Sequence, residues 1–303
     1  MVLCVPCALA RGIILLLDEP LLDRYEQTML IETLTELYDA FARSGYEHVE
    51  DFLEHEVDVE TLRRLRTAAA IEECGEPLVP VPENLVLADP HPYVKAGAPY
   101  GRLSPWQVRA SVAERLQQVQ VHLDALRPGY KLYIHDAYRP LSVQVYMIEY
   151  ECQRLAREQL LDDFHSLDQQ HQARIRSQVR QFWAKPNDHP SDPPPHSTGA
   201  AVDVTIVDAT GAPLNMGAPI DDLTERAYPN YYAEAALVQD KVFHRHRELL
   251  HRVMRSSGFI RNPIEWWHFS YGDQAWAFLE TLAGNATNVS AVYGRVECQV
   301  DDV

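Results

Sequence analysis

A histidine and an aspartate seven residues apart are the strongest candidates for chemistry in this sequence. His196 leaves a proline-rich loop, Gly199 permits a tight turn, and Asp203 lies on the polar face of a predicted strand. Zinc binds imidazole nitrogen and carboxylate oxygen at about 2.0–2.2 Å when rigid elements hold these ligands. The spacing would let both side chains converge on one ion. A loop histidine and an aspartate on the hydrated side of a strand are the alternative interpretation.

A second candidate is the aromatic segment that runs from Glu265 to Phe269. Glu265 precedes His268 by three residues, with Trp266 and Trp267 between them. Residues three apart share a face on a helix but point oppositely on a regular strand. If both serve one metal ion, we expect a bend or bulge near the two tryptophans. The alternative is a hydrophobic strand with one hydrogen-bonded histidine.

A third candidate, Asp136 to Pro140, follows a short predicted strand. Arg139 could stabilise a developing oxyanion or bind a substrate carboxylate. A structural salt bridge between Asp136 and Arg139 is the alternative.

Other histidines are weaker candidates: His189 lacks a following glycine and aspartate in register. The group His244, His246 and His251 alternates with arginines, whose charge disfavours a metal ion.

The elements that must position these residues are helices and strands in mixed order. Apolar periodicity predicts strands over 131–135 and 201–207, a strand-like segment over 265–271, and helices over 104–126, 142–184 and 231–256. An acidic N-terminal part, 19–72, predicts two helical stretches that Gly45 separates, and the proline-rich segment 75–92 predicts a linker or an extended entry into the main domain. Because no regular βαβ alternation and no internal repeat is visible, the fold class is α+β.

Together the three candidate segments resemble a known family, the VanX-type D-alanyl-D-alanine dipeptidases, which are zinc D,D-peptidases of the hedgehog-like fold. The family's S-x-H-x-x-G-x-A-x-D motif resembles residues 194–203, its E-x-W-H motif, in the form E-W-W-H-F, resembles 265–269, and its D-x-Y-R-P element resembles 136–140. A fourth segment, M-G-x-x-F-D, resembles 216–221 with Ile220 in place of phenylalanine. The resemblance covers about residues 92–271. It implies a central antiparallel sheet flanked by helices, here preceded by an N-terminal helical extension.

The same resemblance implies the chemistry of the site. One Zn²⁺ per chain would be bound by His196, Asp203 and His268, with water as the fourth ligand. Glu265 would be the general base, and Arg139 would stabilise the tetrahedral oxyanion. The substrate-binding candidates are Asp221 or Asp222 for the substrate ammonium group, and Tyr100 and Trp267 around the pocket.

Two features depart from the family pattern. Pro194 replaces the serine that helps to hold the substrate's free amino group. The acidic leader of about 90 residues has no counterpart in the shorter dipeptidases. We therefore expect an extension and linker over 1–88, a catalytic domain over 89–280 and a C-terminal tail over 281–303.

Composition limits the partners and the compartment. The chain of 303 residues has 27 basic and 44 acidic residues, a net charge of −17, which disfavours nucleic acid and anionic membranes. Its five cysteines are odd in number and mostly isolated, which favours a reducing cytoplasm, and the family resemblance implies that of a bacterium. Cys4 and Cys7 lack the second pair that a four-thiolate zinc site needs.

Pro6 and Arg11 interrupt the apolar segment 2–17, so export is the less favoured alternative. Nothing in the sequence indicates an oligomeric state.

The leading hypothesis is zinc-dependent hydrolysis of D-Ala-D-Ala or related cell-wall dipeptides. A D,D-carboxypeptidase that trims longer peptidoglycan stem peptides is the alternative within the same chemistry. A zinc-bearing binding module without catalysis is the alternative from another class, although a purely structural site would not need the base Glu265.

Overall fold

The computed structural model describes residues 24–159, 161, 163–284 and 289–296, so the apolar leader and the Cys4–Cys7 pair lie outside the described residues. The sheets are formed by β1 (Leu78–Pro80), β2 (Val86–Leu87), β3 (Gln107–Arg109), β4 (Lys131–Asp136), β5 (Ala201–Val207), β6 (Ile260–Arg261) and β7 (His268–Ser270). The helices are α2 (Arg24–Ser44), α3 (Val49–Glu56), α4 (Val59–Arg66), α5 (Pro92–Lys95), α6 (Ala110–Leu126), α7 (Leu141–Glu158), α8 (Gln169–Phe182), α9 (Val238–Arg255) and α10 (Gln274–Leu282). Short 3₁₀ turns are η1 (Phe164–Ser166), η2 (Pro195–Thr198) and η3 (Glu225–Ala227). This arrangement confirms the α+β class.

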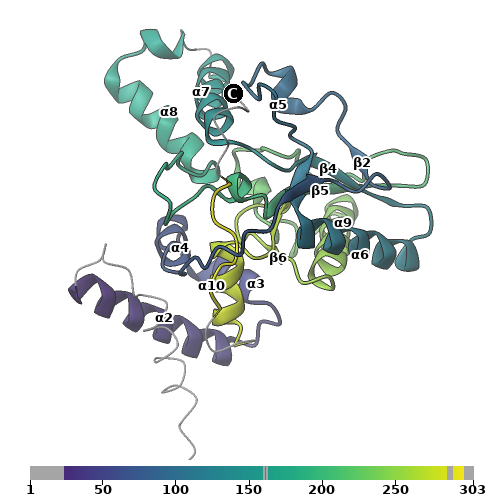
Figure 1. Ribbon diagram of the computed structural model, residues 1–303, viewed down its shortest axis with the longest axis horizontal. Coiled ribbons are helices and arrows are strands. Elements are labelled where there is room, and N and C mark those ends of the chain that lie inside the picture. Colours follow the sequence, from purple (N-terminus) through teal and green to yellow (C-terminus); the bar gives the residue numbers. More distant parts are fainter. Residues whose placement is uncertain (1–23, 160, 162, 285–288, 297–303) are drawn as a thin grey trace, which may run out of the picture.

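A five-stranded sheet in the order β2-β4-β5-β7-β6 forms the centre of the molecule (Figure 1). Its pairs are antiparallel except β2 with β4, which is parallel. The predicted strand over 201–207 is confirmed, and every residue of β5 is buried. Val202, Val204 and Ile206 belong to the main hydrophobic core, together with the apolar side of α6. The opposite side of β5 carries Asp203 and Thr205, as alternation requires.

A register shift between Ile134 and Asp136 interrupts the pairing of β4 with β5. Ile134 lies opposite Val204 on the core face, but Asp136 lies opposite Asp203 instead of Val202. A bulge of this kind adds one residue to one strand and re-aims the side chains that follow it. Asp136 therefore lies on the same side of the sheet as Asp203.

Helices α2, α3 and α4 pack against α10, on the lower side of the view in Figure 1. A hydrophobic cluster joins them to β6 and α10, and it contains Leu53, Leu65, Ile260, Phe278 and Leu279. Ile71 also forms a bridge with Ala291, near the end of the described chain. The N-terminal helices therefore share a core with α10.

Several predicted elements differ from the structure. The predicted helix over 104–126 begins only at Ala110, because residues 107–109 pair with β1. The long helix predicted over 142–184 is two helices: the carboxylate of Asp163 caps η1, and that of Asp168 caps α8 by accepting from the amide of His171. The helix predicted from residue 231 begins at Val238. The strand-like segment over 265–271 is a turn followed by β7, which begins at His268.

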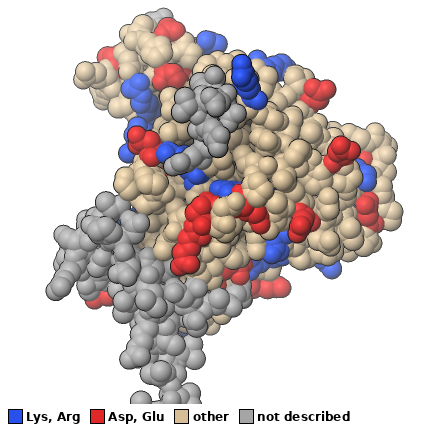
Figure 2. Space-filling model, in the orientation of Figure 1, with Lys and Arg blue, Asp and Glu red and all other residues tan. Residues whose placement is uncertain are grey.

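Charged residues of both signs are interspersed on the surface. In Figure 2, lysine and arginine side chains lie among aspartates and glutamates and form no single large basic patch on the face shown. None of the helices in the described part of the chain has the length and apolar character needed to span a membrane.

We predict that Leu65→Ala lowers the free energy of unfolding of the whole protein by about 2–4 kcal/mol. Leu65 is fully buried in the cluster between α4 and α10. Urea denaturation followed by circular dichroism should show one transition at a lower midpoint. Leu237→Ala, at a leucine that is 67% exposed, should change the free energy of unfolding by less than about 0.5 kcal/mol. A separate early transition in Leu65→Ala, with an unchanged main transition, would show instead that the N-terminal helices unfold independently.

Candidate metal centre and pocket

The sheet places three polar side chains in one row across three strands. Asp203 on β5 lies opposite His268 on β7, and on its other side opposite Asp136 on β4. Directly opposed residues in a sheet point to the same face with their Cβ atoms about 4.5–5.5 Å apart. The Nδ1 atom of His268 lies 3.0 Å from Oδ1 of Asp203. The row therefore brings a carboxylate and an imidazole together.

The 3₁₀ turn η2 supplies the second imidazole, that of His196. Gly199 ends this turn with a positive φ of 72°, and a Cβ atom there would lie 2.4 Å from Cδ2 of Leu78. Only glycine fits this position without displacing its neighbour. Nδ1 of His196 lies 2.7 Å from the carbonyl oxygen of Ala137, which can only accept, so Nδ1 carries the proton. Nε2 is left with its lone pair facing Asp203 and His268.

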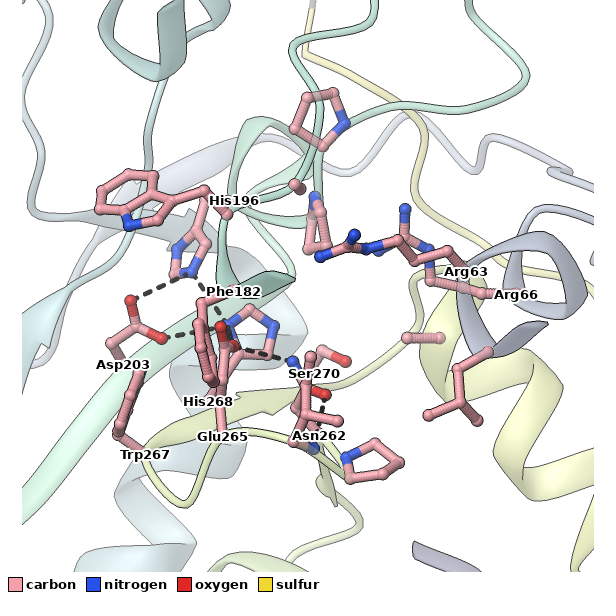
Figure 3. Close-up of a pocket in the computed structure, with 18 of the residues that line it drawn as sticks. Arg63, Arg66, Phe182, His196, Asp203, Asn262, Glu265, Trp267, His268 and Ser270 are labelled. Carbon is pink, nitrogen blue, oxygen red and sulfur yellow. Dashed lines mark hydrogen bonds and ion pairs between the residues drawn. The ribbon is translucent and has the colours of Figure 1, made fainter. Parts of the chain in front are cut away.

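The distances between the three donor atoms fit a metal ion. Nε2 of His196 lies 3.3 Å from Oδ2 of Asp203 and 3.1 Å from Nδ1 of His268 (Figure 3). Metal–ligand bonds of 2.0–2.2 Å place the corners of a tetrahedron about 3.3–3.6 Å apart. All three side chains are buried, and their ligand atoms lie within 4.8 Å of one another. Two imidazoles and a carboxylate suit Zn²⁺ better than Mg²⁺ or Ca²⁺, which prefer oxygen ligands.

The charge state of Asp203 also fits a metal ligand. Burial alone would raise the pKa of its carboxyl group, but the contacts with His196 and His268 lower that pKa well below its usual range. The carboxylate form, which is the form that binds a metal, is thus favoured at neutral pH.

Glu265 lies beside this group, in the turn that precedes β7. Its Oε2 is 3.8 Å from Nδ1 of His268 and accepts a hydrogen bond of 2.8 Å from Nδ2 of Asn262. The turn at Trp266 and Trp267 is the bend expected from the sequence. Burial raises the pKa of Glu265 to about 7. A carboxyl group with a pKa near neutral can both accept and return a proton at physiological pH.

Arg139 lies against the centre and is held from several directions. Its guanidinium contacts Oδ2 of Asp136 at 2.7 Å and Oδ2 of Asp203 at 3.3 Å, and it donates to Gln144 at 2.9 Å. Its Cζ also lies 4.8 Å from the ring centroid of Tyr93 and 4.8 Å from that of Trp183. The predicted salt bridge to Asp136 and a position in the pocket therefore occur together.

The sequence analysis overlooked a layer of residues behind the centre. His91 lies 2.9 Å from Asp136, and its Nδ1 accepts from the backbone amide of Tyr93. Asn262 holds Glu265, and Gln144 holds Arg139. These contacts join residues far apart in the sequence, so no local spacing indicates them. Such partners orient the groups that contact a metal or a substrate.

A cavity of about 110 Å³ adjoins the centre. Of the predicted substrate-binding residues, Asp221 and Trp267 line it. The Asp221 carboxylate accepts a hydrogen bond of 3.0 Å from the Tyr93 hydroxyl, and its backbone has a positive φ of 64°. A non-glycine residue in this conformation is strained, which is typical of functional sites. Burial, followed by the charge of Asp203, raises the pKa of Asp221 well above its usual range.

The structure does not place Asp222 or Tyr100 on the wall of this cavity. Asp222 is paired with Arg226 at 2.7 Å and accepts from the backbone amide of Thr224. The Tyr100 hydroxyl lies 3.5 Å from Asp136, behind the centre. The cavity is also lined by residues from α4, among them Arg63 and Arg66, which the sequence analysis did not single out.

Comparisons with known proteins agree with this geometry. A family described as D-Ala-D-Ala dipeptidase matches residues 88–288. A protein of Synechocystis named D-alanyl-D-alanine dipeptidase is 42% identical over 238 residues, which cover 76% of this chain and 96% of that protein. An Enterococcus faecalis protein of the same name is 27% identical over 168 residues, which cover 54% of this chain and 72% of that protein.

We predict that the purified protein binds about one Zn²⁺ per chain, with tetrahedral ligation. His268→Ala and Asp203→Ala should lose the ion during dialysis, because two remaining ligands cannot hold it. Elemental analysis after dialysis measures the stoichiometry. His189→Ala is the control, since His189 is exposed and outside the cavity. Full zinc content in both ligand variants would exclude this site.

Proposed function

This chain belongs to the D-Ala-D-Ala dipeptidase family, and from that premise we propose that it is a zinc-dependent enzyme that hydrolyses D-Ala-D-Ala or closely related cell-wall dipeptides. The observation that carries the proposal is the convergence of His196, Asp203 and His268 beside the carboxylate of Glu265. The names of the Synechocystis and Enterococcus relatives support the substrate. We also propose the hedgehog-like D,D-peptidase arrangement, with the catalytic domain over 89–280, the extension over 1–88 and the tail over 281–303.

In this proposal His196, Asp203 and His268 hold the zinc ion. Zinc would supply Lewis acidity, which polarises the scissile carbonyl and lowers the pKa of water towards about 7. Glu265 accepts the proton of the attacking water and then delivers it to the nitrogen of the leaving amino group. The C–N bond breaks, and two D-alanine molecules leave. A pKa of about 7 suits Glu265 to both transfers.

Arg139 and Asp221 complete the proposed mechanism. The guanidinium of Arg139 faces the pocket from beside Asp203 and would donate hydrogen bonds to the developing oxyanion. Because Asp136 and Gln144 hold it in place, little reorganisation would accompany the reaction. The Asp221 carboxylate would bind the substrate ammonium group, which would stabilise its charged form.

The alternatives are less well supported. A D,D-carboxypeptidase acting on stem peptides would need an open cleft, whereas residues of α4 and α10 close one side of this cavity. A binding module without catalysis would not require a buried glutamate next to the metal ligands. The proposed compartment, a bacterial cytoplasm, is supported by isolated cysteines such as Cys152, which is free and buried.

We predict that Glu265→Gln lowers kcat for D-Ala-D-Ala by about 10²–10⁴-fold, the usual contribution of general acid–base catalysis. Zinc content should remain at the wild-type value, since Glu265 is not among the proposed ligands. Release of free D-alanine measures the rate. Glu248→Gln, on α9 and outside the cavity, should behave as wild type. Undiminished turnover in Glu265→Gln would refute the assignment of the base.

We predict that acetylation of the substrate's amino group lowers kcat/KM by about 10–100-fold, the value of a hydrogen bond to a charged group. Asp221→Asn should cause a similar loss with D-Ala-D-Ala and little further loss with the acetylated dipeptide. Asp222→Asn is the matched control, because Asp222 is paired with Arg226 outside the cavity. A preference for acetylated dipeptides or pentapeptides would favour the carboxypeptidase alternative.

A further inference from the structure

Within the described chain, three arginines line the cavity: Arg63, Arg66 and Arg139. Arg139 is neutralised by Asp136 and Asp203, and Arg66 lies 3.3 Å from Asp192. Arg63 forms no ion pair with a carboxylate of the described residues. Its Nη2 donates instead to the backbone carbonyl oxygen of Gln181, at 2.8 Å. Among the cavity arginines of the described chain, Arg63 is therefore the one without a carboxylate within ion-pair distance, although the charge of Glu265 acts on it.

Helix α4 presents a regular face to the cavity. Its four cavity-lining residues, Val59, Leu62, Arg63 and Arg66, follow the i, i+3, i+4, i+7 spacing of one helix face. Asp58 caps the helix by accepting from the backbone amides of Glu60 and Thr61, which fixes its start. Figure 3 shows Arg63 and Arg66 across the pocket from His196 and Asp203. The cationic wall is thus part of a defined helix packed on α10.

The surroundings of Arg63 favour the binding of an anion. The side chain is half-buried, and apolar residues Val59, Leu62 and Phe278 line the same cavity. Burial lowers the pKa of Arg63, since fewer waters surround its charge. In such partly desolvated surroundings, an arginine binds a carboxylate more strongly than it does in water.

We propose that Arg63 binds the C-terminal carboxylate of the substrate, so that the N-terminal extension contributes directly to specificity. The inference rests on the proposed dipeptidase function. A dipeptide has an ammonium group at one end and a carboxylate at the other, and the cavity offers Asp221 for the first and Arg63 for the second. Helix α4 precedes residue 88, where the family match begins. Arg63 thus lies outside the residues that match the family model.

The test compares D-Ala-D-Ala with its C-terminal amide in the full-length zinc-loaded enzyme. The wild type should show a KM for the amide that is about 10–100-fold higher. Arg63→Gln should raise the KM for D-Ala-D-Ala by a similar factor, change kcat by less than about threefold, and lose most of the discrimination between the acid and the amide. Arg63→Lys, which keeps the charge, should recover part of that discrimination.

Arg64→Gln is the matched control, because Arg64 lies on the same helix, is exposed and does not line the cavity. It should match the wild type. Calorimetric binding of D-Ala-D-Ala to Glu265→Gln, with and without Arg63→Gln, gives a readout that needs no turnover. Thermal melting of each variant checks that the fold is retained.

The outcomes separate the two proposals. If the wild type cleaves D-Ala-D-Ala but Arg63→Gln keeps the full discrimination between acid and amide, the role of Arg63 is wrong and the dipeptidase function stands. A fall in kcat with KM unchanged would also overturn it, because Arg63 would then act on the chemical step. If the wild type does not cleave the dipeptide and Glu265→Gln does not bind it, both proposals fail.

Discussion

The pairing of β5 with its two neighbours is the constraint on which the site depends. Asp203 faces the pocket only because β5 presents Val202, Val204 and Ile206 to the core. A slip of one residue would exchange the two faces and place valines at the position of Asp203. The register of β4 is interrupted between Ile134 and Asp136, which allows Asp136 to join the same row. The apolar pattern of the core thus fixes the positions of the polar groups.

Once the row is formed, the buried charges must compensate one another, because isolated ions are costly in a medium of low dielectric constant. Asp136 is completely buried, and burial alone would raise its pKa; the charge of Arg139 and the hydrogen bond with His91 lower it instead. The same arginine reaches Asp203. Removing one member would leave its partners uncompensated, so we interpret this network as the support that keeps the pocket groups in place before substrate arrives.

The sequence indicated the residues around the centre better than the elements that surround them. His196, Asp203 and His268 could be predicted because each lies in a short motif that resembles the family's pattern, whereas the spacing alone left other interpretations open. The break between α7 and α8 could not be predicted, because it depends on aspartate caps that apolar periodicity does not detect. Asp221 and Asp222 are adjacent in sequence, and only the folded loop distinguishes the carboxylate in the pocket from the one paired with Arg226.

The position of Arg63 in the pocket could not be predicted from local sequence patterns. The helical stretch around α4 was predicted, but the sequence analysis assigned no role to its arginines, because most charged residues of a helix face the solvent. Their spacing was the available signal. Arg63 and Arg66 lie on the same helix face as Val59 and Leu62, which is unusual for charged residues without a buried partner. That helix face points to the pocket because Leu65, on the neighbouring side of the helix, is fixed in the cluster with α10. The packing that stabilises the N-terminal helices is therefore also what directs a cation toward the candidate metal centre.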